Sequence, residues 1–186
     1  MEIPEDLQRA SDFHGHLCPG LAIGYRASLA AMQRMGIARA YDEELVCVVE
    51  NDSCSVDAVQ FLTGCTFGKG NLVFKDHGKQ VFTFASRQRP GRAVRVSLKT
   101  GAIPPPGEGV DPARRREEAL QRLVSSPLEE LFFVDEIDFE LPQEARIHAS
   151  VLCDSCGELT METRIVEQGG RRLCIPCSEG WTPPPR

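Results

Sequence analysis

Two histidines and a cysteine occupy alternate positions near the N-terminus, at His14, His16 and Cys18 in the stretch DFHGHLCPGLAIGYRAS. Imidazole nitrogen and thiolate sulfur are ligands that zinc and related transition metals prefer. If this segment is extended, residues two apart lie on the same side of the chain, so the three side chains would face one cavity. The spacing predicts a metal or thiol site, followed at once by a turn through Pro19 and Gly20.

Cys18 precedes a predicted helix that begins at Pro19. Cys54 is also expected at the start of a helix, because the polar break ENDSC precedes another predicted helix. A thiolate at a helix N-terminus is stabilised by unsatisfied N–H groups and by the helix dipole, which lower its pKa. Two such helix starts could converge at the ends of neighbouring elements, and His16, Cys18 and Cys54 would then bind one ion. Three protein ligands leave a fourth position for water or substrate, which is the arrangement of catalytic zinc.

Candidate catalytic residues, if the protein is an enzyme, are His14, Cys18 and Cys54, with His14 as general base and Asp57 supporting the ligands. Cys65 would join the metal ligands if the chain turns back before it. One alternative is a thiol redox pair, formed by Cys18 with Cys54 or by Cys54 with Cys65, although this half of the sequence contains no Cys-x-x-Cys motif. Another alternative is that these residues are scattered and share no site.

The four late cysteines form a more specific pattern than the early ones. Two Cys-x-x-Cys pairs are separated by 17 residues, and their members are Cys153, Cys156, Cys174 and Cys177. Each pair can place two sulfurs on one ion, so two pairs complete a tetrahedral shell with no open position. The pattern predicts a structural zinc that supplies the folding energy of a segment too short for a core of its own. Two disulfides or four unliganded cysteines are the alternatives.

The segment from residue 150 to the end carries four basic and five acidic side chains, so it has no electrostatic footprint for DNA binding. We expect nucleic acid not to be a partner and favour a protein-docking role for this module. Trp181 is either a contact point for such a partner or part of a frayed tail.

Composition and charge narrow the class of protein. The chain has 186 residues, with 27 acidic and 21 basic side chains and a net charge of −6, which argues against a non-specific nucleic-acid binder. No apolar run approaches the ~18 residues that span a bilayer, so we expect no membrane association. The acidic N-terminus lacks the apolar region of a secretion signal. A cytoplasmic protein is therefore expected, in which the eight cysteines serve as thiols and metal ligands.

Hydrophobic patterning predicts the helices and strands that must position these side chains. The clearest helix covers 19–35, where apolar residues recur on one face and Gly36 marks the exit. The valine-rich run 45–49 predicts a strand buried on both faces. A loop is expected at 101–112, where proline and glycine dominate. Further helices are expected at 3–10, after ENDSC and at 112–124, and further strands at 71–87 as a hairpin, at 92–98 and in FFVDEIDFELP.

Pro142 and the polar stretch QEAR predict a domain boundary near residue 147. We expect a core domain at 1–147 that carries the His/Cys site. The four-cysteine zinc finger then occupies 148–186.

Two sequence blocks resemble the FmdE family, the family of the E-type subunits of formylmethanofuran dehydrogenase. They are FHGHLCPGLAIGYRAS at 13–28 and CSVDAVQFLTGCTFGKGNL at 54–72, and the predicted hairpin extends the resemblance to about residue 86. The late cysteine pattern is similar to the two-domain branch of that family. Residues 87–147 carry no recognised motif.

The resemblance implies an α+β core, thioredoxin-like in outline, with a mixed β-sheet flanked by helices. It also implies a small C-terminal treble-clef or zinc-ribbon module and a homodimer. The family's site residues fall on His14, His16, Cys18, Cys54 and Cys65 of this sequence, with no departure in residue type.

Some members of this family are encoded with the molybdenum or tungsten enzyme that reduces carbon dioxide onto methanofuran. This chain is too short for the catalytic subunit of that enzyme and lacks a ferredoxin-type cysteine run. We expect a metal-binding accessory protein, with zinc or another divalent transition metal in the core and structural zinc in the tail. Subunits of a molybdenum or tungsten oxidoreductase are candidate partners. A thiol-redox protein, or a non-enzymatic adaptor that docks through the zinc finger, are the alternatives.

Overall fold

The computed structural model of the chain describes residues 2–103 and 111–181. It divides into two compact units, Met1–Ala145 and Arg146–Arg186. Most of the loop expected at 101–112, and the tail TPPPR, lie outside the described residues. Within the described part of the chain, no helix is both long enough and apolar enough to cross a membrane.

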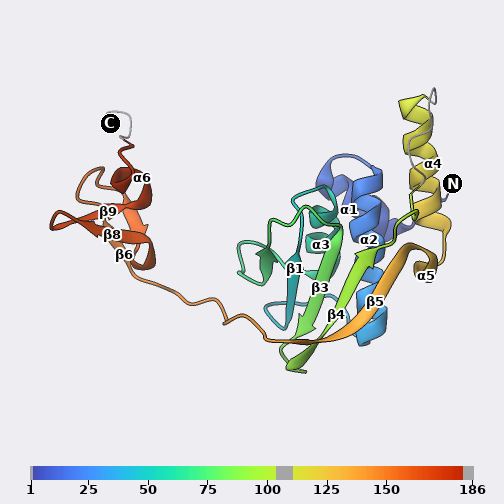
Figure 1. The fold of residues 1–186 in the computed structure, drawn as a ribbon, viewed down its shortest axis with the longest axis horizontal. Coiled ribbons are helices and arrows are strands. Elements are labelled where there is room, and N and C mark those ends of the chain that lie inside the picture. The colour runs from blue at the N-terminus through green and yellow to red at the C-terminus, as the bar shows by residue number, and fades with distance from the viewer. Residues whose placement is uncertain (1, 104–110, 182–186) are drawn as a thin grey trace. The chain divides into compact units, whose positions relative to one another are not determined.

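The first unit is built on a five-stranded mixed sheet with the order β2-β1-β3-β4-β5 (Figure 1). Only β1 and β2 are parallel, and each of the other neighbouring pairs is antiparallel. All five residues of β1 are buried, which confirms the strand expected to be covered on both faces. The strands are β1 (Leu45–Val49), β2 (Leu72–Phe74), β3 (Val81–Ser86), β4 (Gly91–Leu98) and β5 (Phe132–Phe139).

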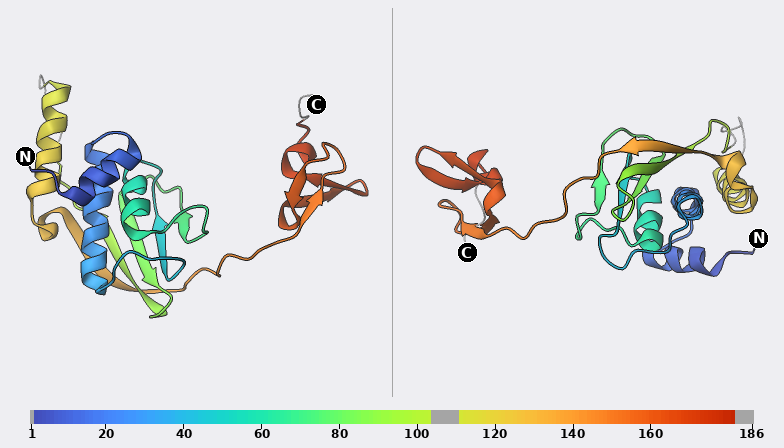
Figure 2. Two further views of the ribbon diagram at one scale, coloured as in Figure 1. Left: turned by 180° about the vertical axis from the view of Figure 1, so that it is seen from behind. Right: turned by 90° about the horizontal axis from the view of Figure 1, so that it is seen from below.

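Helices α1, α2 and α3 lie together on one face of this sheet (Figure 2). The predicted start and end of α2 are confirmed, since Pro19 occupies its first turn and Gly36 closes it in the left-handed conformation. The helices are α1 (Glu5–His14), α2 (Pro19–Met35), α3 (Ser55–Thr63), α4 (Pro112–Ser125) and α5 (Leu128–Leu131). The expected α+β class, with a mixed sheet flanked by helices, is therefore confirmed.

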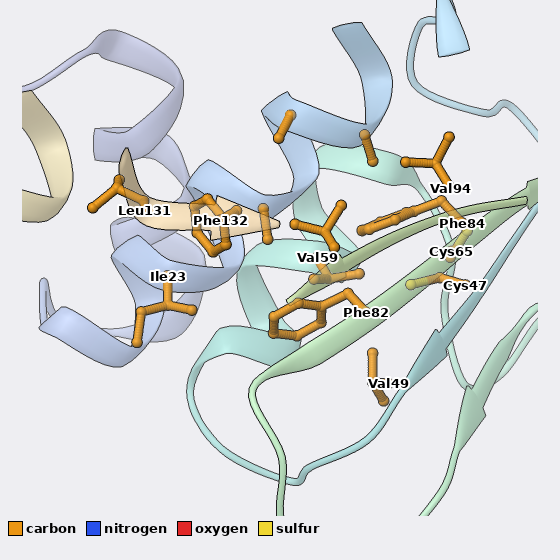
Figure 3. Packing of buried hydrophobic residues seen from close by; sticks show 14 of the residues in the cluster. Ile23, Cys47, Val49, Val59, Cys65, Phe82, Phe84, Val94, Leu131 and Phe132 are labelled. Carbon is orange, nitrogen blue, oxygen red and sulfur yellow. The ribbon is translucent and has the colours of Figure 1, made fainter. Parts of the chain in front are cut away.

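The main core lies between the sheet and the helices. Phe82 and Phe84 of β3 are fully buried there, and Val59 of α3 and Ile23 of α2 pack into the same cluster (Figure 3). A second cluster joins α1 to α2, where the Tyr25 hydroxyl donates to the Asp6 carboxylate at 2.7 Å. Burial and this hydrogen bond raise the pKa of Tyr25 well above its usual value, so the phenol stays neutral.

Helices α2 and α3 approach each other closely enough to exclude a side chain at Gly24 and to leave a tight fit at Gly20. A Cβ on Gly24 would lie 1.9 Å from the backbone oxygen of Ser55, and one on Gly20 would lie 3.2 Å from the Cβ of Cys54. Glycine permits this contact because it has no side chain. The N-terminal ends of the two helices, with Cys18 and Cys54, therefore meet.

The predicted hairpin at 71–87 is wrong. Strands β2 and β3 do not pair with each other, because β1 lies between them and pairs with both. The connection between them crosses the end of β1, where the Lys75 amide donates to the Val49 carbonyl and the Lys79 amide donates to the Glu50 carbonyl. A strand that is apolar on both faces is most stable in the interior of a sheet, and β1 takes that place.

The second unit consists of two hairpins and a short helix. Its strands and helices are β6 (Ser150–Leu152), β7 (Leu159–Met161), the 3-10 turn η1 (Glu162–Arg164), β8 (Ile165–Gln168), β9 (Arg171–Cys174) and α6 (Ile175–Ser178). Its buried cluster contains Leu173 and the cysteines, with little other apolar side chain. So small a core cannot stabilise the unit alone, and the sulfur cluster must carry its stability.

We predict that Gly24→Ala destabilises the first unit by about 3 kcal/mol, because the new methyl group would collide with the α3 backbone. Urea unfolding followed by circular dichroism measures this change. Gly68→Ala is the matched control, since a Cβ there meets nothing within 4 Å. Equal unfolding midpoints for the two variants would contradict the close helix contact.

Candidate metal centres and an adjoining cleft

The four late cysteines gather around one point in the second unit. Their sulfurs all lie within 4.8 Å of one another. A turn through Gly157, whose φ is 69°, follows the first pair, and the Gly157 amide donates to the Cys153 carbonyl at 2.9 Å. Cys174 ends β9 and Cys177 lies in α6, so the second pair is placed by a strand and the helix that follows it.

Hydrogen bonds prepare Cys153 for the thiolate state. Backbone N–H groups of Cys156 and Cys174 lower the pKa of Cys153 to about 6, and the Cys174 amide lies 3.2 Å from its sulfur. Burial and hydrogen bonds with the neighbouring cysteines raise the pKa of Cys177 to about 12. Four thiolates can share so small a volume only when a dication neutralises them, which is the chemistry of a structural zinc site.

The early cluster is assembled by the end of one helix and the start of the next. The ligand atoms of His14, His16 and Cys18 lie within 4.8 Å of one another. The backbone that brings them together is not the expected extended segment, because α1 continues through His14 and ends at Gly15 with a φ of 99°. The left-handed glycine reverses the chain, so the histidines meet through a helix cap and not through strand alternation.

His14 is held in one orientation by α3. Its Nδ1 lies 2.7 Å from the Asp57 carboxylate, and its ring centroid lies 4.6 Å from that of His16. Its Nε2 is buried and has no hydrogen-bond partner within the described ranges. A carboxylate on Nδ1 favours the tautomer whose Nε2 carries a free lone pair, which is the state that binds a metal.

Cys18 and Cys54 lie side by side at the starts of α2 and α3. A Cβ on Gly20 would lie 3.8 Å from each of the two sulfurs. Cys18 caps α2, where its sulfur accepts from the Leu21 amide at 3.4 Å. Cys54 precedes α3 but makes no side-chain cap bond.

The expected lowering of the Cys54 pKa is wrong. Burial raises the pKa of the Cys54 thiol, and its hydrogen bond with Cys18 raises it further. The first N–H groups of α3 do not compensate, because Val56 donates to the Ser53 carbonyl and Asp57 donates to the Cys54 carbonyl.

Cys65 is not brought to this cluster. It is fully buried beside Cys47 in the main core, and its sulfur donates to the Leu45 carbonyl at 3.3 Å (Figure 3). Cys18 and Cys54 belong to the other apolar cluster. The left-handed Gly64 ends α3 directly before Cys65, and burial raises the pKa of Cys65 to about 11. The expectation that Cys65 binds the core metal is therefore not supported by its position.

A cleft of about 480 Å³ adjoins the early cluster, and His14, Cys54 and Asp57 lie on its wall. It opens at the carboxyl ends of the parallel strands β1 and β2, the edge at which open α/β sheets bind ligands. Sequence reasoning missed its aromatic wall, formed by Phe67 and Phe74. The available signal was the polar break directly after a buried strand, which is typical of such an edge.

Comparison with known families gives two separate matches. Residues 13–133 match the profile of a family described as FmdE, Molybdenum formylmethanofuran dehydrogenase operon. Residues 147–180 match the prokaryotic dksA/traR C4-type zinc finger. The first match contains the His/Cys cluster and the cleft, and the second contains the four late cysteines.

Two individual proteins are similar over most of the chain. A protein of Archaeoglobus fulgidus named as a probable S-adenosyl-L-methionine-binding protein is 31% identical over 196 residues, which is 92% of this chain and 52% of the relative. The chain thus spans about half the length of that curated relative. A crystal structure of a tungsten formylmethanofuran dehydrogenase FmdE-like protein from Syntrophus aciditrophicus matches with a TM-score of 0.70 and 23% identity. That match covers 94% of this chain and 90% of the other, and it establishes the likeness of fold.

We predict that Cys156→Ser releases the zinc of the second unit and unfolds that unit alone, because a shell of three thiolates binds the ion more weakly. Zinc content by atomic emission and two-dimensional NMR of the full chain measure both effects. Ser150→Ala, an exposed change in β6, is the control and keeps the zinc. A Cys156→Ser protein with a folded, zinc-loaded second unit would disprove the structural role.

Proposed function

The chain belongs to the FmdE family, and we propose that it is a metal-binding accessory protein with a divalent transition metal in its core and structural zinc in its finger. The observation that carries the core site is the His14 Nε2, buried without a partner beside the donor atoms of His16 and Cys18. Leaving a buried polar atom unsatisfied costs about 1–3 kcal/mol, and a bound ion removes that cost.

The proposed ligands are His14, His16 and Cys18, with Cys54 as a fourth and exchangeable donor. Cys54 lies on the wall of the cleft, so it is the ligand that an incoming molecule would displace. His14, expected from the sequence as a general base, fits better as a ligand because its free nitrogen is buried among other donors. An ion held in this way supplies a Lewis acid at the edge of the cleft.

A thiol-redox function is the second candidate, and the contact between Cys18 and Cys54 favours it. The pairing of Cys54 with Cys65 loses support, because those residues belong to different clusters. The two functions make opposite demands on the sulfurs, since a metal site needs both reduced and a redox pair needs them to form a disulfide in turnover.

The homodimer and the association with molybdenum or tungsten oxidoreductase subunits stay predictions. Analytical ultracentrifugation of the full chain tests the dimer.

An adaptor role through the finger is favoured by the exposed side chains Leu159 and Trp181 in the second unit.

We predict about two metal ions per chain in anaerobically purified protein, and about one after Cys18→Ser, because the substitution removes a core thiolate. Elemental analysis, with a parallel count of free thiols, measures this. The control Cys47→Ala changes a buried cysteine of the main core that belongs to neither proposed metal site, and it keeps both ions. One ion per wild-type chain together with a Cys18–Cys54 disulfide would instead establish the redox candidate.

We predict that Asp57→Asn weakens binding of the core metal about 10- to 100-fold, because the carboxylate that orients the His14 ring is lost. Competition with a chromophoric chelator measures the affinity. Asp138→Asn makes the same chemical change at an exposed residue of β5 and should leave the affinity unaltered. Equal affinities in the two variants would remove Asp57 from the site.

A further inference from the structure

The cleft beside the core cluster has the size and the position of a small-molecule site. Its volume is about 480 Å³, and ligand pockets commonly enclose about 300–1,000 Å³. Val49, the last residue of β1, and Leu72, the first residue of β2, both line it. The cleft shares His14 and Cys54 with the proposed metal site, so a molecule bound in it would reach the ion.

Two phenyl rings form an exposed aromatic wall of this cleft. Phe67 is 77% exposed and Phe74 is 45% exposed. Large apolar side chains left in contact with water beside a concave site are typical of ligand-binding surfaces, and aromatic faces favour planar rings or cations.

The loop that carries Phe67 is tied to the core site. Its amide donates to the Gln60 side-chain oxygen at 3.5 Å, and the Gln60 amide nitrogen donates to Asp57 at 3.3 Å. Asp57 in turn holds His14. The backbone at Phe67 is therefore linked through Gln60 to Asp57, the residue that orients the proposed metal ligand His14.

The charge of the cleft is negative. Asp52 and Asp57 lie on its wall, and none of its described lining residues is lysine or arginine. No hydrogen bond or ion pair joins the Asp52 carboxylate to another residue of the described ranges. Two of the nearby amides are already engaged within the protein, because the Ser53 amide donates to the Asn51 side chain and the Val56 amide donates to the Ser53 carbonyl.

A bound metal would not reverse this charge. The thiolates of Cys18 and Cys54 together neutralise a dication, and neutral imidazoles add no charge. The two carboxylates then leave the cleft with net negative charge, which disfavours phosphates and carboxylates and attracts cations.

We propose that the cleft binds a planar organic cation, with an aromatic or heteroaromatic ring on Phe67 and Phe74 and a cationic nitrogen at Asp52. The inference rests on the proposed function in one respect, since the core ion is what a ligand of this cleft would meet at Cys54. The same charges disfavour phosphorylated metabolites.

Binding of two matched probes tests this inference. Tryptamine and indole-3-propionate share a ring and a two-carbon chain but carry an ammonium or a carboxylate at its end. Ligand-observed NMR titration of the full-length protein should show tryptamine binding about tenfold more tightly. Asp52→Asn should abolish most of that preference, and Phe67→Leu should weaken both probes. Indistinguishable affinities, or no binding of either probe, would overturn the proposal.

Control variants separate this result from the metal site. Asp76→Asn and Phe133→Leu make the same chemical changes at exposed residues outside the cleft lining and should bind as the wild type does. The same titration with Cys18→Ser protein, together with the metal content of both proteins, separates the cleft proposal from the proposed core metal site. If the wild-type protein prefers tryptamine but contains only the ion of the finger, the cleft proposal holds and the core metal site is ruled out. If it contains two ions per chain but shows no preference, the core metal site holds and the cleft proposal is overturned.

Discussion

Helices α2 and α3 touch backbone to backbone at Gly24 and Ser55, and no larger residue than glycine fits between them. This contact sets the relative position of the two helix starts, and with it the separation of the Cys18 and Cys54 sulfurs. Asp57, one turn into α3, then fixes the ring of His14 at the end of α1. The candidate site thus depends on three helix ends that converge on one point, and the packing of α2 on α3 is what makes them converge.

The four cysteines of the finger and the His/Cys cluster of the first unit differ in what surrounds their donor atoms. In the finger, four sulfurs surround one point, and the unit has little apolar core besides. In the first unit the fold is stabilised by Phe82, Phe84 and their neighbours without any ion, so the His/Cys cluster is free to serve another purpose. A closed shell suits structure, whereas a cluster that borders a cleft suits exchange of ligands.

Local signals in the sequence predicted those features that depend on neighbouring residues. Pro19 and Gly36 marked the ends of α2, the valine run marked β1, and the spacing of the late cysteines marked the finger. Features set by long-range packing were not predictable in this way. The place of β1 between β2 and β3, and the burial of Cys65 beside Cys47, follow from how the sheet is ordered, which a single sequence does not specify.

A chain of hydrogen bonds runs from His14 through Asp57 and Gln60 to the amide of Phe67. It joins the proposed core metal site to the proposed ligand cleft. Thermodynamic linkage requires the effect of each occupant on the other to be equal in free energy. If the core ion fixes the His14 ring and through it the position of Phe67, it would raise the affinity of the cleft for its ligand. The bound ligand would then raise the affinity of the site for the ion by the same factor.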